Sequence, residues 1–140
     1  MEKLTRPEDN RYKAITQDIC VTVTPFFLDE QSNPEKSHFV WAYEVEILNQ
    51  GTSTIQLRER TWLITNERGD HEHVHGPGVV GEQPILNPGD LFRYTSGCPL
   101  NTASGFMSGS YTMTTETGER FDVEIPAFAL DMPGARGRIN

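Results

Sequence analysis

Three histidines alternate with other residues where the chain reads His-Glu-His-Val-His. They are His71, His73 and His75. Successive side chains of a β-strand leave opposite faces, so imidazoles two residues apart can bind one zinc, nickel or copper ion. At roughly 3.3 Å per residue the outer two Cα atoms lie about 13 Å apart. One ion would therefore engage a neighbouring pair and a further ligand such as Glu72 or Glu82. If Val74 instead faces the core, the histidines form a solvated face, metal capture is adventitious, and no cofactor is expected.

The next six residues read Gly-Pro-Gly-Val-Val-Gly, which is the spacing G-x-G-x-x-G. In a dinucleotide-binding fold a helix begins at this turn and its N-terminus meets the pyrophosphate. No helix can begin here, because Pro84 and the turn Asn87-Pro88-Gly89 leave too little chain before the next strand. Two interpretations remain: the loop amides form a concave site for pyrophosphate or a nucleotide, or the glycines only shape a turn. The residues of this candidate site are Gly76, Gly78, Gly81 and Glu82.

Two further stretches carry reactive or charged groups. Arg60 could bind a phosphate or carboxylate with paired hydrogen bonds, or it could pair with a glutamate of its own sheet. Cys98, in Ser96-Gly97-Cys98-Pro99, would be a nucleophile only beside a base such as His75 and with a lowered thiol pKa. The sequence supplies neither condition, so we expect a packed thiol and no enzyme.

The elements that must position these groups are strands, because no segment shows a sustained helical period. Ile55 and Leu57 lie in one phase of the alternation, whereas Trp62 and Ile64 lie in the other. Such a slip would expose the buried face unless a bulge absorbs it, so we predict a bulge within residues 58–61. About seven or eight short strands predict an all-β, antiparallel, immunoglobulin- or fibronectin type III-like β-sandwich. The clearest alternating runs span 19–24, 39–47, 55–64, 71–75, 91–96, 107–113 and 121–125, with irregular chain at 76–90 and a loop at 98–105.

Length and composition indicate one domain. The chain has 140 residues, and we expect a flexible lead-in at 1–17, the sandwich at 18–130 and a flexible tail at 131–140. The formal charge of -8 disfavours nucleic acid, which binds through clustered Lys and Arg. No apolar run approaches the roughly 20 residues of a membrane helix, and the charged start lacks a secretory signal, so the expected location is the cytoplasm.

Several ordered segments resemble the bacterial ApaG family across roughly 19–130. The segments are PFFLDEQSNPE, FVWAYEVEILNQG, RTWLITN, GPGVVGEQPILNPGD, YTSGCPL and GERFDVEIPAFAL. The resemblance implies a fibronectin type III-like sandwich and an association with cobalt tolerance and magnesium efflux. It also implies a protein-interaction role, by similarity to domains of F-box proteins and of a polymerase delta-interacting protein. The three histidines do not match the family pattern. The positions that do match family motifs are Arg60, Trp62, Gly76, Gly78, Gly81, Glu82, Pro84, Tyr94, Ser96, Gly97 and Cys98.

The leading hypothesis is a non-catalytic module that presents the glycine loop, the Arg60 region and a 96–100 loop to a protein partner. The competing hypothesis is a binder of pyrophosphate or a nucleotide, and the third is divalent metal binding through two histidines. A homodimer is a further alternative, because an exposed edge strand can pair with a second copy of the chain.

Overall fold

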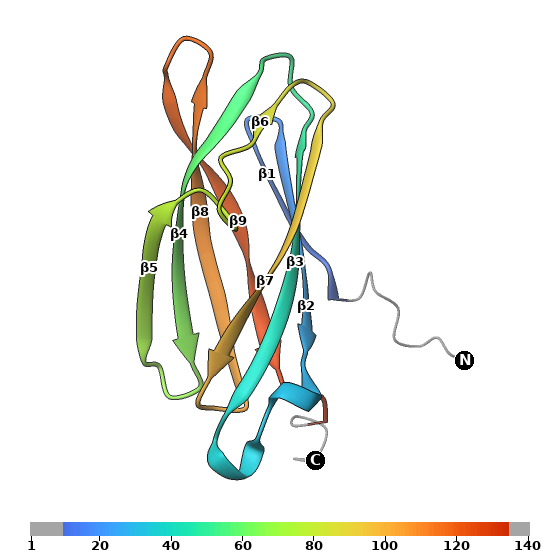
Figure 1. Cartoon of the computed structure of the whole chain (residues 1–140), viewed down its shortest axis with the longest axis vertical. Helices are drawn as coiled ribbons and strands as arrows, with labels where there is room; N and C mark the ends of the chain where they lie inside the picture. Colours follow the sequence, from blue (N-terminus) through green and yellow to red (C-terminus); the bar gives the residue numbers. More distant parts are fainter. Residues whose placement is uncertain (1–9, 135–140) are drawn as a thin grey trace, which may run out of the picture.

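The structure, a computed structural model, describes residues 10–134. Nine strands and two short 3-10 turns lie within that range (Figure 1). The strands are β1 (Tyr12–Thr16), β2 (Ile19–Phe27), β3 (Phe39–Asn49), β4 (Ile55–Asn66), β5 (His71–Pro77), β6 (Ile85–Leu86), β7 (Leu91–Leu100), β8 (Ser104–Thr115) and β9 (Arg120–Asp131). The 3-10 turns, η2 (Asp29–Gln31) and η3 (Pro34–Lys36), connect β2 to β3. No helix in the described part of the chain is long and apolar enough to cross a membrane.

The strands form two antiparallel sheets that pack face to face. The first sheet has the order β1-β2-β3-β7, and the second has the order β5-β4-β8-β9 with β6 paired to the end of β4. The prediction of an all-β antiparallel sandwich is confirmed. Two strands that the alternation did not reveal, β1 and β6, bring the number in the described residues to nine.

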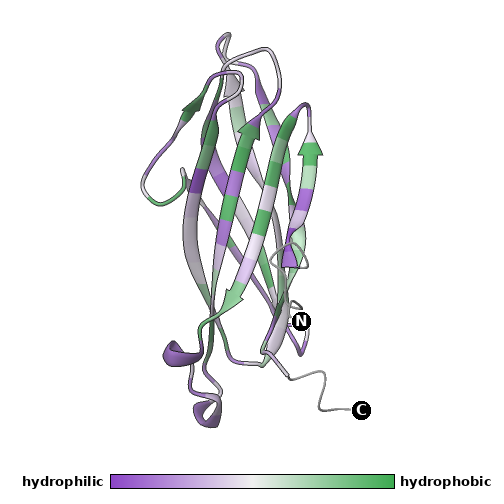
Figure 2. Ribbon diagram, turned by 90° about the vertical axis from the view of Figure 1, so that its right-hand side faces the viewer, coloured by the Kyte–Doolittle hydropathy of each residue, from purple (hydrophilic) through white to green (hydrophobic). Residues whose placement is uncertain are grey.

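Alternation builds the core between the sheets. Along β3 every second residue is buried, beginning with Phe39, Trp41 and Tyr43. Figure 2 shows the matching bands of hydrophobic and hydrophilic residues along the strands. Phe128 of β9 and Trp62 of β4 meet Tyr43 in the centre, with ring centroids 5.3 to 6.0 Å apart. Such aromatic pairs add to the apolar burial that holds the two sheets together.

The predicted bulge in β4 is confirmed. The register between β4 and β8 shifts between Leu57 and Glu59, which leaves Arg58 as the additional residue. A bulge of one residue restores the phase in which Leu57 and Trp62 are both buried. Arg60 consequently lies on the same inward face as Trp62.

Three predicted boundaries are wrong. Strand β1 lies inside the predicted lead-in, because Gln17 and Asp18 adopt φ values of 46° and 67° and turn the chain back onto β2. Residues 96–100 belong to β7 and pair with β3, so they are not a loop. Strand β9 continues to Asp131, where the tail was predicted to begin. Residues 1–9 and 135–140 lie outside the described residues.

The sandwich is closed on one side and open on the other. On the closed side, the amide of Glu124 in β9 donates to Thr16 Oγ1 of β1 at 3.1 Å. The rings of Tyr12 and Phe128 lie 6.2 Å apart on the same side. On the open side the two sheets end in β7 and β5, and within residues 10–134 no hydrogen bond or aromatic ring contact joins these two strands. The sequence-predicted site residues gather around this open side.

Candidate binding groove

Two adjoining cavities follow the open side between β7 and the β4–β5 hairpin. Their volumes are about 380 and 280 Å³. We call them together the edge groove. Its shared lining residues are Tyr43, Arg60, Trp62 and Ser96. The glycine loop closes one end of the groove, and Glu72, Val74 and Cys98 line the other.

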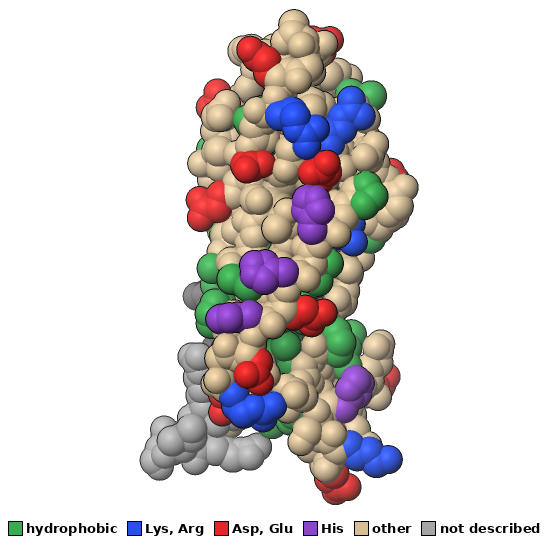
Figure 3. Space-filling view, turned by 90° about the vertical axis from the view of Figure 1, so that its left-hand side faces the viewer, with side chains coloured by type: hydrophobic (Ala, Val, Ile, Leu, Met, Phe, Trp, Pro, Cys, Tyr) green, Lys and Arg blue, Asp and Glu red, His purple; other side chains and the backbone are tan. Residues whose placement is uncertain are grey.

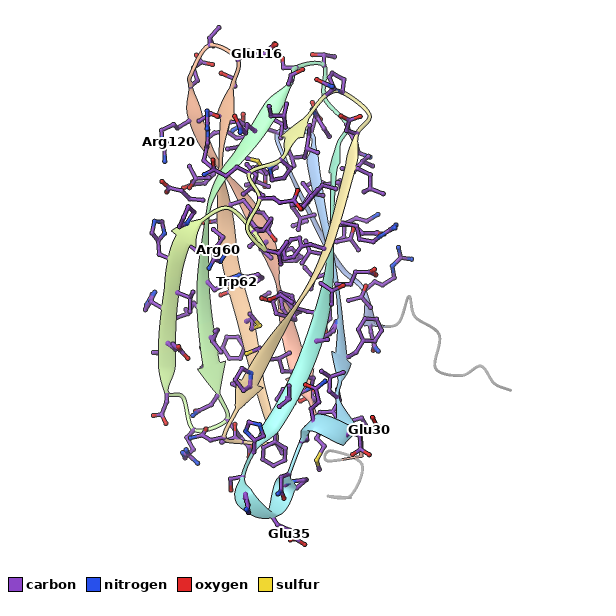
Figure 4. The ribbon with its side chains drawn as sticks, in the orientation of Figure 1. Glu30, Glu35, Arg60, Trp62, Glu116 and Arg120 are labelled. Carbon is purple, nitrogen blue, oxygen red and sulfur yellow. The ribbon has the colours of Figure 1, made fainter. Side chains whose placement is uncertain are left out.

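Arg60 is held in the groove by backbone oxygens. Its Nη1 donates to the carbonyl oxygens of Pro77 and Gly78, each at 3.0 Å. A Cβ atom on Gly76 would lie 3.1 Å from Nη1 and 3.3 Å from Nη2, so the guanidinium rests where a side chain of residue 76 would stand. Figure 4 shows Arg60 and Trp62 on β4, with both side chains pointing toward the first sheet.

Arg60 has no carboxylate partner among the ion pairs of the described residues. The alternative that it pairs with a glutamate of its own sheet is therefore wrong for these residues. The nearby Glu59 instead lies 3.3 Å from Arg120 and 3.5 Å from His75. Among the described residues, carbonyl oxygens hold the guanidinium without cancelling its charge, and its remaining N–H donors suit an incoming anion.

The glycine loop is a tight two-residue turn. The amide of Val79 donates to the carbonyl of Glu82, and the amide of Glu82 donates back to Val79, both at 2.8 Å. The central residues Val80 and Gly81 have φ values of 42° and 82°, which define a type I′ turn. Gly78 has φ +63°, and a Cβ there would lie 2.3 Å from the Glu82 carbonyl oxygen. The three glycines of the loop therefore have three different roles. Gly76 leaves room for Arg60, Gly78 allows the close approach to the Glu82 backbone, and Gly81 adopts the positive φ of the turn.

This geometry changes the predicted anion site. The amides of Gly78, Val79 and Glu82 already donate within the protein, since Gly78 N lies 2.8 Å from the Arg58 carbonyl oxygen. A pyrophosphate could meet only the amides of Val80 and Gly81 together with Arg60. Glu82 is exposed and contributes backbone groups to the turn.

Tyrosine hydroxyls form a polar inner wall of the groove. Ser96 hydrogen-bonds the Tyr43 phenol, and burial raises the pKa of Tyr43 despite that bond. The hydroxyls of Tyr94 and Tyr111 hydrogen-bond one another in the core. Burial also raises the pKa values of these two phenols. All three tyrosines consequently stay neutral and can donate or accept hydrogen bonds.

The alternation over 39–47 predicts a core face for Tyr43, but it does not connect these hydroxyls with Arg60. The available signal was the shared strand phase of Tyr43 with Trp41 and of Tyr94 with Ser96.

Cys98 is a packed thiol, as predicted. Its side chain is 2 % exposed. Burial, with the charge of Glu72 as a smaller cause, raises the pKa of the thiol to about 11. A nucleophilic cysteine needs the opposite shift, which favours the thiolate. Neither a base nor an activating cation is hydrogen-bonded to Cys98 among the described residues, where Sγ contacts only the Pro99 carbonyl oxygen at 3.7 Å.

The three histidines lie on the outer face of the second sheet, away from the edge groove (Figure 3). The predicted shared face of His71, His73 and His75 is confirmed by the pairing of β5 with β4. His71 Nδ1 lies 3.2 Å from Thr65 Oγ1, and His75 Nδ1 lies 2.9 Å from Thr61 Oγ1. Within residues 10–134 no group of three or more His, Cys, Asp and Glu side chains is placed to hold a metal ion.

The structure thus brings together most of the predicted site. The groove or its glycine wall includes Arg60, Gly76, Gly78, Gly81, Ser96, Gly97 and Cys98. The histidines belong to a separate surface. Two antiparallel sheets with an open polar groove at one side define the class: an all-β sandwich domain with a groove along one edge.

Comparison with known proteins agrees with this class. The family model of the ApaG domain matches residues 29–115. The chain is 56 % identical to Protein ApaG of Paramagnetospirillum magneticum and 57 % identical to that of Rhodospirillum centenum, each over 92 % of this chain and 99 % of the relative. The crystal structure of an ApaA protein from Bordetella pertussis superimposes with a TM-score of 0.81 at 45 % identity, covering 86 % of this chain and 98 % of that one. The chain belongs to the ApaG domain family.

Proposed function

We propose that this chain is a non-catalytic binding module whose edge groove receives a segment of a protein partner. The observation that carries the proposal is the Arg60 guanidinium, which two carbonyl oxygens hold in an open groove without a carboxylate partner among the described residues. A partly desolvated guanidinium is a strong anchor for an acidic group of a ligand. The aromatic ring of Trp62 and the Tyr43 and Tyr94 phenols supply the mixed apolar and polar wall typical of peptide-binding sites.

Binding is favoured over catalysis because the described residues place no activated nucleophile in the groove. The thiol of Cys98 keeps its proton, and the three histidines lie on another face. A general base would have to lie within hydrogen-bond reach of the group that it activates. The described hydrogen bonds of the groove join only tyrosine, serine, arginine and backbone groups.

Selection of peptides from a random library displayed on phage tests this proposal. We expect the wild-type chain to enrich peptides that share an acidic position. The Arg60→Gln variant should bind synthetic copies of these enriched peptides at least about tenfold more weakly. His73→Ala is the matched control, because it alters the outer face of the same hairpin and should bind like the wild type. Equal binding by Arg60→Gln, with its fold confirmed by circular dichroism, would refute the role of the groove.

A second candidate function is binding of a small anion such as pyrophosphate or a nucleotide. The favouring observation is that Arg60 lies in one cavity with Val80 and Gly81, whose amides donate to no group of the described residues. Titration with pyrophosphate should then shift the amide resonances of Val80 and Gly81 and the Arg60 Nε resonance. If millimolar pyrophosphate leaves these three signals unchanged, the small-anion function is excluded and the peptide function is unaffected.

We further propose that the partner connects this module to divalent-cation homeostasis in the cytoplasm. This proposal rests on the association of the family with cobalt tolerance and magnesium efflux. In a strain that lacks its own ApaG, cobalt tolerance should be restored by the wild type and by His73→Ala, and not by Arg60→Gln. Restoration by all three variants would separate the phenotype from the edge groove.

A further inference from the structure

Within residues 10–134 the first sheet has no strand opposite β5. Strands β4, β8 and β9 of the second sheet each contact the first sheet, through Trp62 to Tyr43, Tyr111 to Tyr94, and Phe128 to Tyr12 respectively. The inward residues of β5 meet no such cover, because Glu72 is exposed and Val74 and Gly76 are only half-buried. The first sheet ends at β7, so one strand position beside β7 and across from β5 is vacant.

The backbone of β7 is ready to pair at that vacant position. The Asn49 amide donates to the Asp90 carbonyl at 3.0 Å, which sets the even-numbered residues of β7 to bond with β3. The backbone of Val40 in β3 confirms this alternation. Its amide donates to Ser32 Oγ and its carbonyl accepts from the Leu28 amide, both on the side of β3 away from β7. The odd-numbered residues therefore direct their N–H and C=O groups to the free edge. These residues are Leu91, Arg93, Thr95 and Gly97, and then Pro99, which has no N–H.

The inward groups beneath the vacant position carry a fixed order of charge. Ser96 of β7 lines a cavity with Arg60, Cys98 lines one with Val74, and Leu100 lines one with Glu72. The order along the groove is therefore cationic, apolar, anionic. Alternate residues of an added strand would point onto these three places, about 7 Å apart at the usual rise per residue.

We propose that an extended peptide of a protein partner adds to β7 as an antiparallel strand, with a basic, an apolar and an acidic residue at alternate positions. The acidic residue lies opposite Ser96 and pairs with Arg60, the apolar residue lies opposite Cys98, and the basic residue lies opposite Leu100 and pairs with Glu72. This inference rests on the proposed binding function and adds its mode and its ligand class. Antiparallel addition matches the ladders of the whole first sheet.

The two ends of the described chain lie away from the vacant position. Asn10 and Pro133, close to the two ends of the described chain, line a cavity together with Tyr12 of β1 and Ala129 of β9. That cavity lies on the closed side of the sandwich, whereas the vacant position lies on the open side. The charge order beneath the position selects a partner segment of matching polarity.

The probe is the acetylated and amidated peptide Ser-Lys-Thr-Val-Thr-Glu-Thr-Thr, and its control exchanges the Lys and Glu. We expect the control to bind at least about tenfold more weakly, since both charged contacts would become repulsive. In the complex, the amides of Thr95 and Gly97 should exchange hydrogen at least about tenfold more slowly. Equal affinity for the two peptides, or protection at His73 and His75 on the edge of β5 instead, would overturn the proposal. Slowed exchange at β7 without peptide, in a dimer detected by light scattering, would also overturn it by assigning the position to a second copy.

Thr95→Pro removes one free-edge N–H without removing a bond to β3, and Thr95→Ala is its matched control. Thr95→Pro should weaken binding at least about tenfold, whereas Thr95→Ala should bind like the wild type. If Thr95→Pro fails to fold, methylation of the backbone nitrogen of the Thr that lies between Val and Glu tests the same ladder on the wild-type chain. That nitrogen would donate to the Gly97 carbonyl oxygen. If peptide binding needs Arg60 but is unaffected by Thr95→Pro and by the N-methylation, strand addition is refuted and the proposed function stays intact. If no bound peptide depends on Arg60, both the strand addition and the proposed binding function are refuted.

Discussion

The hydroxyl pair of Tyr94 and Tyr111 allows a quantitative test of the groove wall. Tyr111 is 0 % exposed, and its hydroxyl bonds to Tyr94. Replacing Tyr94 by Phe would leave the buried Tyr111 hydroxyl without this hydrogen-bond partner, which lowers the unfolding free energy by about 1 to 3 kcal/mol. Tyr111→Phe should cost less, about 0.5 to 1.5 kcal/mol, because the Tyr94 residue lines the groove and is 7 % exposed, whereas Tyr111 is fully buried. The double replacement removes both polar groups, so it should cost less than the sum by about 1 to 2 kcal/mol.

Urea unfolding followed by tryptophan fluorescence measures this cycle, since Trp41 and Trp62 are buried and will report the loss of the core. At roughly 3 to 6 °C per kcal/mol for a domain of this size, Tyr94→Phe should also lower the melting temperature by about 5 to 10 °C. Tyr12→Phe is the control, because the Tyr12 hydroxyl makes no hydrogen bond within the described residues, and it should change stability by less than about 0.5 kcal/mol. Additivity of the two single changes within about 0.4 kcal/mol would refute the buried pair.

Three more outcomes are expected. Gly109→Ala should destabilise the fold by about 1 to 3 kcal/mol in urea unfolding, because a Cβ there would lie 2.1 Å from the Thr61 carbonyl oxygen; a neutral effect would contradict this backbone approach. Val80→Asn should stabilise the chain by about 0.5 to 1 kcal/mol, because it places Asn-Gly in the type I′ turn where Val80 now has a positive φ, and an unchanged melting temperature would argue against strain there. The unfolding free energy should be independent of the Cys98 thiol below about pH 9 and should fall as the pH rises toward 11, because the folded pKa is raised from 9.0 to about 11 and only the unfolded chain ionises in between. Stability curves of wild type and Cys98→Ala with the same slope from pH 8.5 to 10.5 would contradict that shift.

Local patterns were sufficient for the sandwich and for part of the groove. The strict alternation from Phe39 to Ile47 predicts a half-buried strand because side chains of a strand alternate between two faces. The phase slip before Trp62 predicts the bulge at Arg58 for the same reason. The glycine spacing and the cysteine segment predict the residues that shape the site, although not the partners that they contact.

Other boundaries depended on pairing. Strand β1 has only a weak apolar face and a Gln-Asp turn, so its place is set by hydrogen bonds with β2. Likewise, Gly97 and Pro99 carry turn chemistry in sequence, yet they continue β7 because the long strand β3 lies beside them. Propensity is a weak guide wherever a neighbouring strand supplies the hydrogen bonds.

The sequence by itself determined the fold class, the bulge and the common face of the three histidines, since each follows from the two-residue period of a strand. Only the tertiary structure decided that those histidines face away from Arg60, that the Pro77 and Gly78 carbonyls hold its guanidinium, and that β5 lacks a strand across from it. These features arise where segments distant in sequence meet, and a local period carries no information about which sheet edges stay open.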